Sequence, residues 1–326
     1  MSLDDLGIAE SVSRCLAPKL EALRGKKIVF SCEDKKMIPV DGWGLRSNPY
    51  TAAAVTTIRP VRENALVAAI DSSSVKIAET ENGGLFAVKC GIATACAGRP
   101  LMHFKIGPIL FYLSENTIQD SELDERLAKL VVMDDDYAKR MIRVRAERAV
   151  QKALATHLTK SLILVDGSLK ASVFEDRERS ISKIVESCVL RKNMLIGISK
   201  GTKLKVLDRA AAPLSKVPGP AYVDVDMIIK SLVRNSFGSS SMVKLGKSSP
   251  ILRADIVGDR AGSFGMLVAN DPLAGGYPET LKIVHYISTF TSTEMTCLRS
   301  HVLNTYGVTE LAADDIRSIL LGSISV

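Results

Sequence analysis

The chain has 326 residues, of which 46% are hydrophobic, so it can bury a substantial core in one large domain or two modest ones. Its 43 Lys and Arg residues outnumber the 36 Asp and Glu residues, and the resulting net charge of +7 favours a polyanionic partner. This composition excludes a disordered protein, and no charge-free stretch approaches the ~20 residues that a membrane span requires.

Strands dominate the first part of the chain. Strand material is expected at 51–58 and at 66–71, the second run ending on Asp71 in "LVAAIDSSS". The block 83–114 has β-branched and aromatic residues interrupted by Gly and Pro, which indicates a hairpin or meander. Residues 122–160 are rich in Leu, Ala, Arg and Glu with helical periodicity, which predicts a long helix broken near "MDDDY".

The middle of the chain repeats the apolar run that ends on aspartate. In "SLILVDGSL", at 161–169, the predicted strand ends on Asp166. A helix over about 177–192 and a short strand at 193–199 follow. Residues 200–250 are less regular, with one helical segment near 224–235, and we interpret them as an insertion.

The last part of the chain predicts a hairpin and two helices. The segments "PILRADIV" and "GSFGMLVAN", at 250–257 and 262–270, have the pattern of a β-hairpin. Residues 276–290 predict a helix with Pro278 in its first turn, and 308–321 predict a final helix. The order of elements indicates a mixed α/β sheet flanked by helices rather than a simple doubly wound sheet.

The N-terminal segment and the cysteines indicate a protein of a reducing compartment. Residues 1–25 predict an amphipathic helix that lacks the basic and apolar regions of a signal peptide. The cysteines include no C-x-x-C pair and have no close His partner, so neither a zinc ribbon nor a disulfide framework is indicated. These cysteines are Cys15, Cys32, Cys90, Cys96, Cys188 and Cys297. We therefore expect a cytoplasmic protein with reduced thiols.

The two strand-end aspartates are the first candidates for a functional site. Taken alone, Asp166 before Gly167 is a common turn signal, and Asp71 before a chain reversal is typical of a cap. Two aspartates at strand ends can, however, converge on one edge of a sheet. Two neighbouring carboxylates repel each other unless a cation lies between them, so the pair suggests a metal site.

Glu147 is the third acidic candidate. At 100° per residue it lies within about 60° of Val144, Val150 and Leu154, so it falls on the apolar stripe of the predicted long helix. A glutamate that faces the core is unusual unless it is paired. An ion pair with Arg143, one turn back, and a role as a metal ligand both account for it.

The last two candidates lie in "NDPLAGGYPETLKIVHYIS". His285 is about two turns into the predicted helix, and Tyr277 stands at the corner before it. Taken alone, His285 is more typical of a core histidine, and Tyr277 is more typical of a packing aromatic residue.

The order of these features resembles the NurA family of nucleases, whose fold is RNase H-like. The features are an Asp on a first strand, a hairpin, a helix with an inward Glu, an Asp on the next strand and a late His. The resemblance rests on "AIDSSS", on Glu147 before "LILVDGSL", and on "DPLAGGYPETLKIVH", where Tyr277 and His285 take the family's Tyr and His positions. It extends from about residue 60 to about residue 290. Ser72 stands where the family usually has glycine.

The resemblance implies a single nuclease domain over the whole chain. An RNase H-like mixed β-sheet flanked by helices would form its core. The expected parts are an N-terminal helix at 1–25, core segments at 60–200 and 250–290, an insertion at 200–250 and C-terminal helices at 291–326.

The resemblance also implies a metal-dependent deoxyribonuclease. Two divalent ions, manganese or magnesium, would be held by Asp71, Glu147, Asp166 and His285. Tyr277 would position a phosphate or a ligand. Carboxylate oxygens suit both ions, whereas one imidazole favours manganese.

The implied substrate is DNA, as single strands and duplex ends. The family resemblance implies a homodimer that works with a HerA-type hexameric ATPase, as a 5′–3′ exonuclease and also as a single-strand endonuclease, in end resection for recombinational repair. Basic residues of the long helix would track the DNA backbone or face solvent, and they include Arg140, Arg143 and Arg148. The alternatives are a catalytically inactive adaptor that binds DNA or the translocase and, third, a hydrolase of small phosphoesters.

Overall fold

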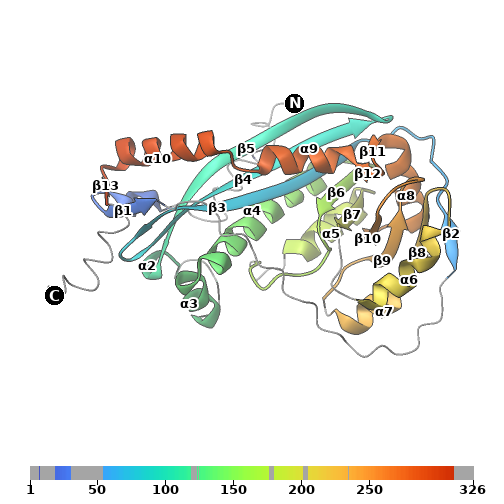
Figure 1. Ribbon diagram of the computed structural model, residues 1–326, viewed down its shortest axis with the longest axis horizontal. Coiled ribbons are helices and arrows are strands. Elements are labelled where there is room, and N and C mark those ends of the chain that lie inside the picture. The colour runs from blue at the N-terminus through green and yellow to red at the C-terminus, as the bar shows by residue number, and fades with distance from the viewer. Residues whose placement is uncertain are drawn as a thin grey trace, which may run out of the picture.

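The protein is built around one large mixed sheet with helices on both of its faces (Figure 1). The structure is a computed structural model that describes residue 7 and residues 19–30, 54–118, 123, 125–175, 180–200, 205–233 and 235–311. Within these ranges, eleven strands join the large sheet. No helix in the described part of the chain has the length and apolar character needed to cross a membrane.

Five strands form the centre of the sheet. The antiparallel meander β3 (Val67–Thr80), β4 (Gly83–Cys96) and β5 (Arg99–Ser114) confirms the expected hairpin region. Next to β3 lie β6 (Leu162–Asp166) and β7 (Met194–Ser199), both parallel to it. The spatial order β5-β4-β3-β6-β7 is that of an RNase H-like fold, so the predicted fold class is confirmed.

Helices connect β5 to β6 and β6 to β7. After α2 (Glu115–Ile118) come α3 (Glu125–Met133) and α4 (Asp135–His157). The break between α3 and α4 falls at Asp134, whose side chain accepts a hydrogen bond from the backbone N–H of Asp136 and so caps α4. The prediction of a long helix broken at "MDDDY" is therefore confirmed. The predicted helix after Asp166 is α5 (Ser180–Leu190).

The expectation that Asp71 ends a strand is wrong. Asp71 lies inside β3, which continues to Thr80 because β4 pairs with it along that whole length. The parallel partner β6 is shorter, and its pairing with β3 stops at Ile70 opposite Val165. Asp71 therefore lies at the level where β6 ends on Asp166, and the two aspartates still meet.

Residues 200–250 contain more structure than the one helix predicted there. They contribute strands and helices: α6 (Lys205–Ser215), β8 (Ala221–Asp224), α7 (Asp226–Leu232) and β9 (Ser239–Lys244). α7 is the predicted helix, and α6 is an additional one. Both strands join the large sheet, which runs β7-β10-β9-β8-β2 on this side, with β10 at Ile251–Val257 and β2 at Val55–Thr57.

The predicted hairpin at 250–270 is wrong in its second half. β10 pairs with β7 and β9, and the next segment is the helix α8 (Arg260–Asn270). Asp259 starts this helix because its carboxylate accepts a hydrogen bond from the N–H of Gly262. Gly265 lets α8 approach the chain at Arg59, whose carbonyl oxygen would lie 2.5 Å from an added Cβ. A pattern of small and apolar residues fits a buried helix as well as a strand.

The C-terminal helices α9 (Glu279–Ser288) and α10 (Ser292–Tyr306) cover the opposite face of the sheet from α4 (Figure 1). The same part of the chain contains the short pair β11 (Leu273–Ala274) and β12 (Tyr277–Pro278), and β13 (Thr309–Glu310), which joins the large sheet. The predicted helix at 276–290 is confirmed as α9, with Pro278 at its N-cap.

The described residues near the two chain ends test only part of the helices that were predicted there. β13 pairs with β1 (Lys27–Phe30), so residues 309–310 are a strand rather than the start of a final helix. The rest of the predicted helix, at 312–321, lies outside the described residues. Of the expected helix at 1–25, the structure describes little beyond a 3-10 turn at Leu20–Leu23.

A glycine in β4 lets α9 lie close to the sheet. Gly91 stands opposite Asp71 in the β3–β4 ladder, and an added Cβ would lie 2.7 Å from Ile287 Cγ1 and 3.0 Å from the carbonyl oxygen of Val284. Any side chain at this position must push α9 outward. Gly91 therefore determines how closely α9, the helix that carries His285, approaches the sheet.

We expect Gly91→Ala to destabilise the protein by about 1–3 kcal/mol, the usual cost of overpacking a core. Because α9 would shift, the substitution should also reduce the rise in melting temperature that Mn²⁺ produces. Thermal melts with and without Mn²⁺ measure both effects. Gly219→Ala is the matched control, since nothing lies within 4 Å of the added Cβ there. Equal melting behaviour of the two variants would refute this account of α9.

Candidate metal centre

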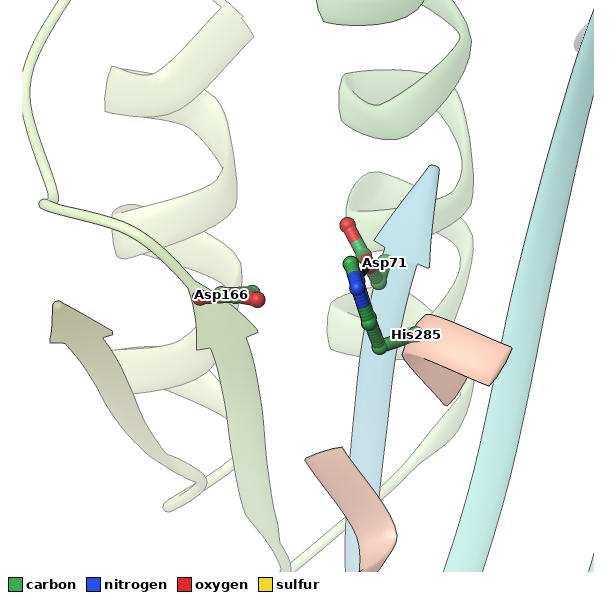
Figure 2. A group of neighbouring side chains, drawn as sticks. All are labelled: Asp71, Asp166 and His285. Carbon is green, nitrogen blue, oxygen red and sulfur yellow. Dashed lines mark hydrogen bonds and ion pairs between the residues drawn. The ribbon is translucent and has the colours of Figure 1, made fainter. Parts of the chain in front are cut away.

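Asp71, Asp166 and His285 come together at the end of β6. One potential ligand atom from each lies within 4.8 Å of those of the other two. Figure 2 shows how they are supplied: Asp71 from β3, Asp166 from the tip of β6 and His285 from α9. Three of the four predicted ligands are therefore neighbours, although they are far apart in the sequence.

Asp71 makes the most polar contacts of the three residues in this group. Its Oδ1 accepts a hydrogen bond of 2.8 Å from the backbone N–H of Ser72. Its Oδ2 lies 3.0 Å from His285 Nδ1 and 3.4 Å from the hydroxyl of Ser288, which donates to it. The Asp71 side chain is 10% exposed and the imidazole is 62% exposed, so the site opens to solvent on the His285 side.

α9 is fixed at both of its ends, which fixes His285. At the start of the helix, Asp271 accepts hydrogen bonds from the N–H groups of Glu279 and Thr280 and from the Thr280 hydroxyl. Just after its end, Lys89 Nζ from β4 donates to the carbonyl oxygen of Thr289 at 2.7 Å. Lys89 is buried, so its ammonium group is a firm anchor.

Asp166 has a cationic partner that the sequence did not reveal. Lys200 Nζ lies 2.8 Å from Asp166 Oδ2. The same ammonium group lies 5.5 Å from the ring centroid of Tyr277. Lys200 follows β7 directly, and no periodicity or motif in the sequence distinguishes it from other lysines.

Tyr277 is buried beside the two aspartates. Burial raises the pKa of its hydroxyl, and the negative charges of Asp166 and Asp71 raise that pKa further. The phenol therefore keeps its proton near neutral pH. Among the described residues its hydroxyl has no hydrogen-bond partner. Tyr277 thus places a buried donor, without a partner in the described part of the chain, beside two carboxylates.

Glu147 reaches the region from the other face of the sheet. Its Oε2 accepts a hydrogen bond of 2.8 Å from the Ser72 hydroxyl, and its Oε1 accepts one of 2.8 Å from the Gln151 amide. Successive residues of a strand point to opposite faces, so Ser72 faces α4 while Asp71 faces α9. Glu147 is not among the three clustered ligands.

The environment of Glu147 favours its protonated form. Burial raises the pKa of its carboxyl, and nearby Asp71 adds to that rise, against the opposing effects of Arg148, the Ser72 hydrogen bond and Arg143. Among the described residues it makes no ion pair with Arg143, so the simple pairing considered from the sequence is not found. A bound cation would stabilise the carboxylate form.

Arg148 is not a surface residue, contrary to the prediction of a DNA-tracking or solvated side chain. It is 9% exposed. Its guanidinium donates to Glu175 Oε1 at 2.9 Å, to Gln151 Oε1 at 2.6 Å and to the carbonyl oxygen of Lys170 at 3.0 Å. This chain of contacts ties Gln151, and through it Glu147, to the loop after Asp166.

The three clustered side chains suit a divalent cation. Oxygen ligands lie about 2.0–2.6 Å from such ions, so two ligands of one ion are at most about 5 Å apart. The separations of 4.8 Å or less meet this limit. Two carboxylates and one imidazole form a donor set that suits manganese and also magnesium.

The sheet with the RNase H-like strand order carries this group at the end of β6, and the group forms a candidate metal centre. Comparison with protein families gives a match to the NurA domain over residues 65–290, more than half of the chain. The chain belongs to the NurA family. Comparison with curated proteins found no significant match.

Solved structures with a similar arrangement include two NurA proteins and an endonuclease V. The NurA nuclease from Sulfolobus solfataricus is 13% identical, with 76% of this chain and 87% of that chain covered and a TM-score of 0.44. A NurA bound to dAMP and manganese is 10% identical, with 79% and 91% covered and a TM-score of 0.47. Endonuclease V from Ciona intestinalis in complex with DNA is 15% identical, with 74% and 92% covered and a TM-score of 0.38. With TM-scores this low, the family assignment rests on the sequence match.

Proposed function

We propose that this protein is a metal-dependent deoxyribonuclease that hydrolyses phosphodiester bonds. The observation that carries the proposal is the convergence of Asp71, Asp166 and His285 within 4.8 Å in a chain of the NurA family. The net charge of +7 supports a polyanionic substrate. We therefore take DNA, as single strands and duplex ends, as the substrate.

Each site residue has a proposed role. Asp71, Asp166 and His285 bind the metal. Glu147 completes the ligand set after its side chain rotates and gives up the hydrogen bond from the Ser72 hydroxyl. Two bound ions, manganese or magnesium, would polarise the phosphodiester and activate the attacking water. Tyr277 donates a hydrogen bond from its unpaired hydroxyl to a phosphate oxygen or to a ligand. Its raised pKa keeps that proton in place.

The biological setting is also part of the proposal. We propose a cytoplasmic homodimer that acts with a HerA-type hexameric ATPase on DNA ends. Its activity would be 5′–3′ exonuclease cleavage, with endonuclease cleavage of single strands as a second activity, in end resection for recombinational repair. Family membership supports these points.

Cleavage assays with labelled DNA test the activity. We expect single strands to be cut in the presence of Mn²⁺ or Mg²⁺ and to stay intact in EDTA, because carboxylates alone cannot activate water in this way. A 5′ label and a 3′ label on matched strands reveal the polarity of digestion. A chromogenic small phosphodiester should be hydrolysed much more slowly than DNA. Efficient hydrolysis of that compound would instead favour the hypothesis of a hydrolase of small phosphoesters.

A catalytically inactive, DNA-binding adaptor is the second candidate. One observation favours it: Ser72 and Gln151 occupy both oxygens of Glu147, and Ser72 stands where the family usually has glycine. Such an adaptor would bind labelled DNA in a gel-shift assay and leave it uncut at every Mn²⁺ concentration. If Ser72→Gly then gained cleavage, the serine would be the cause of inactivity.

A further inference from the structure

Lys200 is placed where it must respond to a cation at the site. It follows the end of β7, and β7 pairs in parallel with β6 so that Ile198 lies opposite Asp166. Its ammonium group makes two contacts, the 2.8 Å ion pair with Asp166 Oδ2 and the position 5.5 Å from the Tyr277 ring centroid. The Lys200 side chain is 48% exposed, so it is free to take other positions.

An ammonium group and a divalent ion compete for the same carboxylate. Both are positive, and two cations bound to the Asp166 carboxylate would repel each other at such short range. An ion pair whose lysine is half exposed is weak, whereas a divalent ion held by two carboxylates and an imidazole is bound more strongly. Lys200 would therefore leave Asp166 when a metal ion binds to that carboxylate.

The displaced ammonium group would keep an attraction to the Tyr277 ring. Its contact with the face of the Tyr277 ring does not depend on Asp166, because it is an attraction between a cation and an aromatic ring. That attraction would keep the ammonium group beside the site after it leaves Asp166. A phosphate that approaches the metal then meets a free lysine, which is a common phosphate ligand in proteins.

We infer that Lys200 is a counter-ion switch. Its ammonium group pairs with Asp166 until a metal ion takes that carboxylate, and then binds a non-bridging phosphate oxygen of the nucleic acid. The metal-displacement step concerns the metal centre alone, and the phosphate step rests on the proposed nuclease function. Lys200 would thus couple metal binding to substrate binding.

The first test measures metal affinity in the absence of DNA. Lys200→Met keeps most of the side-chain stem and removes the charge. With no ammonium group to displace, we expect half-saturation at roughly two- to fivefold lower Mn²⁺, which corresponds to the usual strength of an exposed ion pair. Melting temperature against Mn²⁺ concentration, and titration calorimetry, give the value. Lys129→Met is the matched control, because it removes a lysine from an exposed ion pair with Glu125 on α3.

The second test measures DNA affinity with Ca²⁺ in place of Mn²⁺. We expect Lys200→Met to bind a labelled single strand about tenfold more weakly than wild type, because it lacks one charge-assisted contact to phosphate. The Lys129→Met variant should bind like wild type. Opposite changes in the two affinities, tighter for metal and weaker for DNA, are the signature of the switch.

Three results would overturn the inference. Unchanged or weaker Mn²⁺ binding by Lys200→Met would refute the competition for Asp166. DNA binding equal to that of Lys129→Met would refute the phosphate contact. Wild-type protein that binds no DNA would refute that contact together with the nuclease proposal, while the metal titration would still decide whether Lys200 competes with metal.

Discussion

Asp166→Asn is expected to abolish cleavage while leaving the folded protein intact. An amide has nearly the same shape as a carboxylate but is a poor ligand for a hard cation, so the site loses charge that it needs to hold metal. Metal ions contribute several kcal/mol of transition-state stabilisation, which corresponds to a fall in rate of about 10²–10⁴-fold. We expect a loss of at least this size at a fixed Mn²⁺ concentration.

The stability of the same variant should change little. The Asp166 carboxylate is repelled by Asp71 and attracted by Lys200, whose side chain is half exposed. Because the substitution removes both effects, the metal-free variant should melt within about 1 kcal/mol of wild type. Saturating Mn²⁺, at about 100 times its dissociation constant, stabilises wild type by about 2.7 kcal/mol, and the variant should gain much less.

Melting curves with and without Mn²⁺, run beside cleavage of a labelled single strand, measure these effects. Asp136→Asn is the control, since it removes an exposed carboxylate that pairs with Lys139 at the start of α4. It should cleave and bind metal like wild type. If Asp166 were only a turn residue, Asp166→Asn would keep its activity and its response to Mn²⁺.

Much of the fold could be predicted because its signals are local. Helical periodicity and the three consecutive acids that begin at Asp134 predicted the broken α3–α4 helix, and continuous apolar runs predicted the strands that carry Asp71 and Asp166. α8 was missed because its Gly, Ser and apolar residues also suit a strand. The Asp259 cap and the packing of α8 against the sheet favour the helix. The true length of β3 depends on its partner β4, which no local pattern around Asp71 reveals.

The candidate site shows the same difference between residues with local sequence signals and residues whose position depends on the tertiary structure. Asp71, Asp166 and His285 could be identified because two apolar runs end on aspartate and the family pattern supplies a histidine. Lys200 could not, because its importance comes from the parallel register that places it beside β6. Arg148 was interpreted as a surface residue since helical periodicity cannot show that the 170–175 loop folds over that side of α4.

Arg148 supplies the largest expected effect on stability. Its guanidinium is the only cationic partner within ion-pair distance of Glu175 among the described residues, and the Glu175 side chain is 3% exposed. Backbone N–H groups of Ser172 and Ile181 also donate to Glu175, but they do not neutralise its charge. Within the part of the chain that the structure describes, loss of Arg148 would therefore leave the buried Glu175 carboxylate without a counter-charge.

We expect Arg148→Met to lower the free energy of unfolding by about 3–5 kcal/mol, the usual cost of removing one partner of a buried ion pair. That is a large share of the 5–15 kcal/mol that typically stabilises a folded protein. Mn²⁺ affinity should fall as well, because Gln151 loses the guanidinium that fixes its amide against Glu147. Urea denaturation gives the first quantity, and metal titration gives the second.

A second substitution separates the buried charge from lost packing. In the double variant Arg148→Met with Glu175→Met, no unpaired charge remains, so at least half of the lost stability should return. Arg143→Met, on an exposed position of the same helix, should change stability by less than about 0.5 kcal/mol. If Arg148→Met were as mild as Arg143→Met, the guanidinium would be free to face DNA, as the sequence alone suggested. A large loss that Glu175→Met relieves would instead establish Arg148 as the residue that fixes the loop after Asp166 to α4.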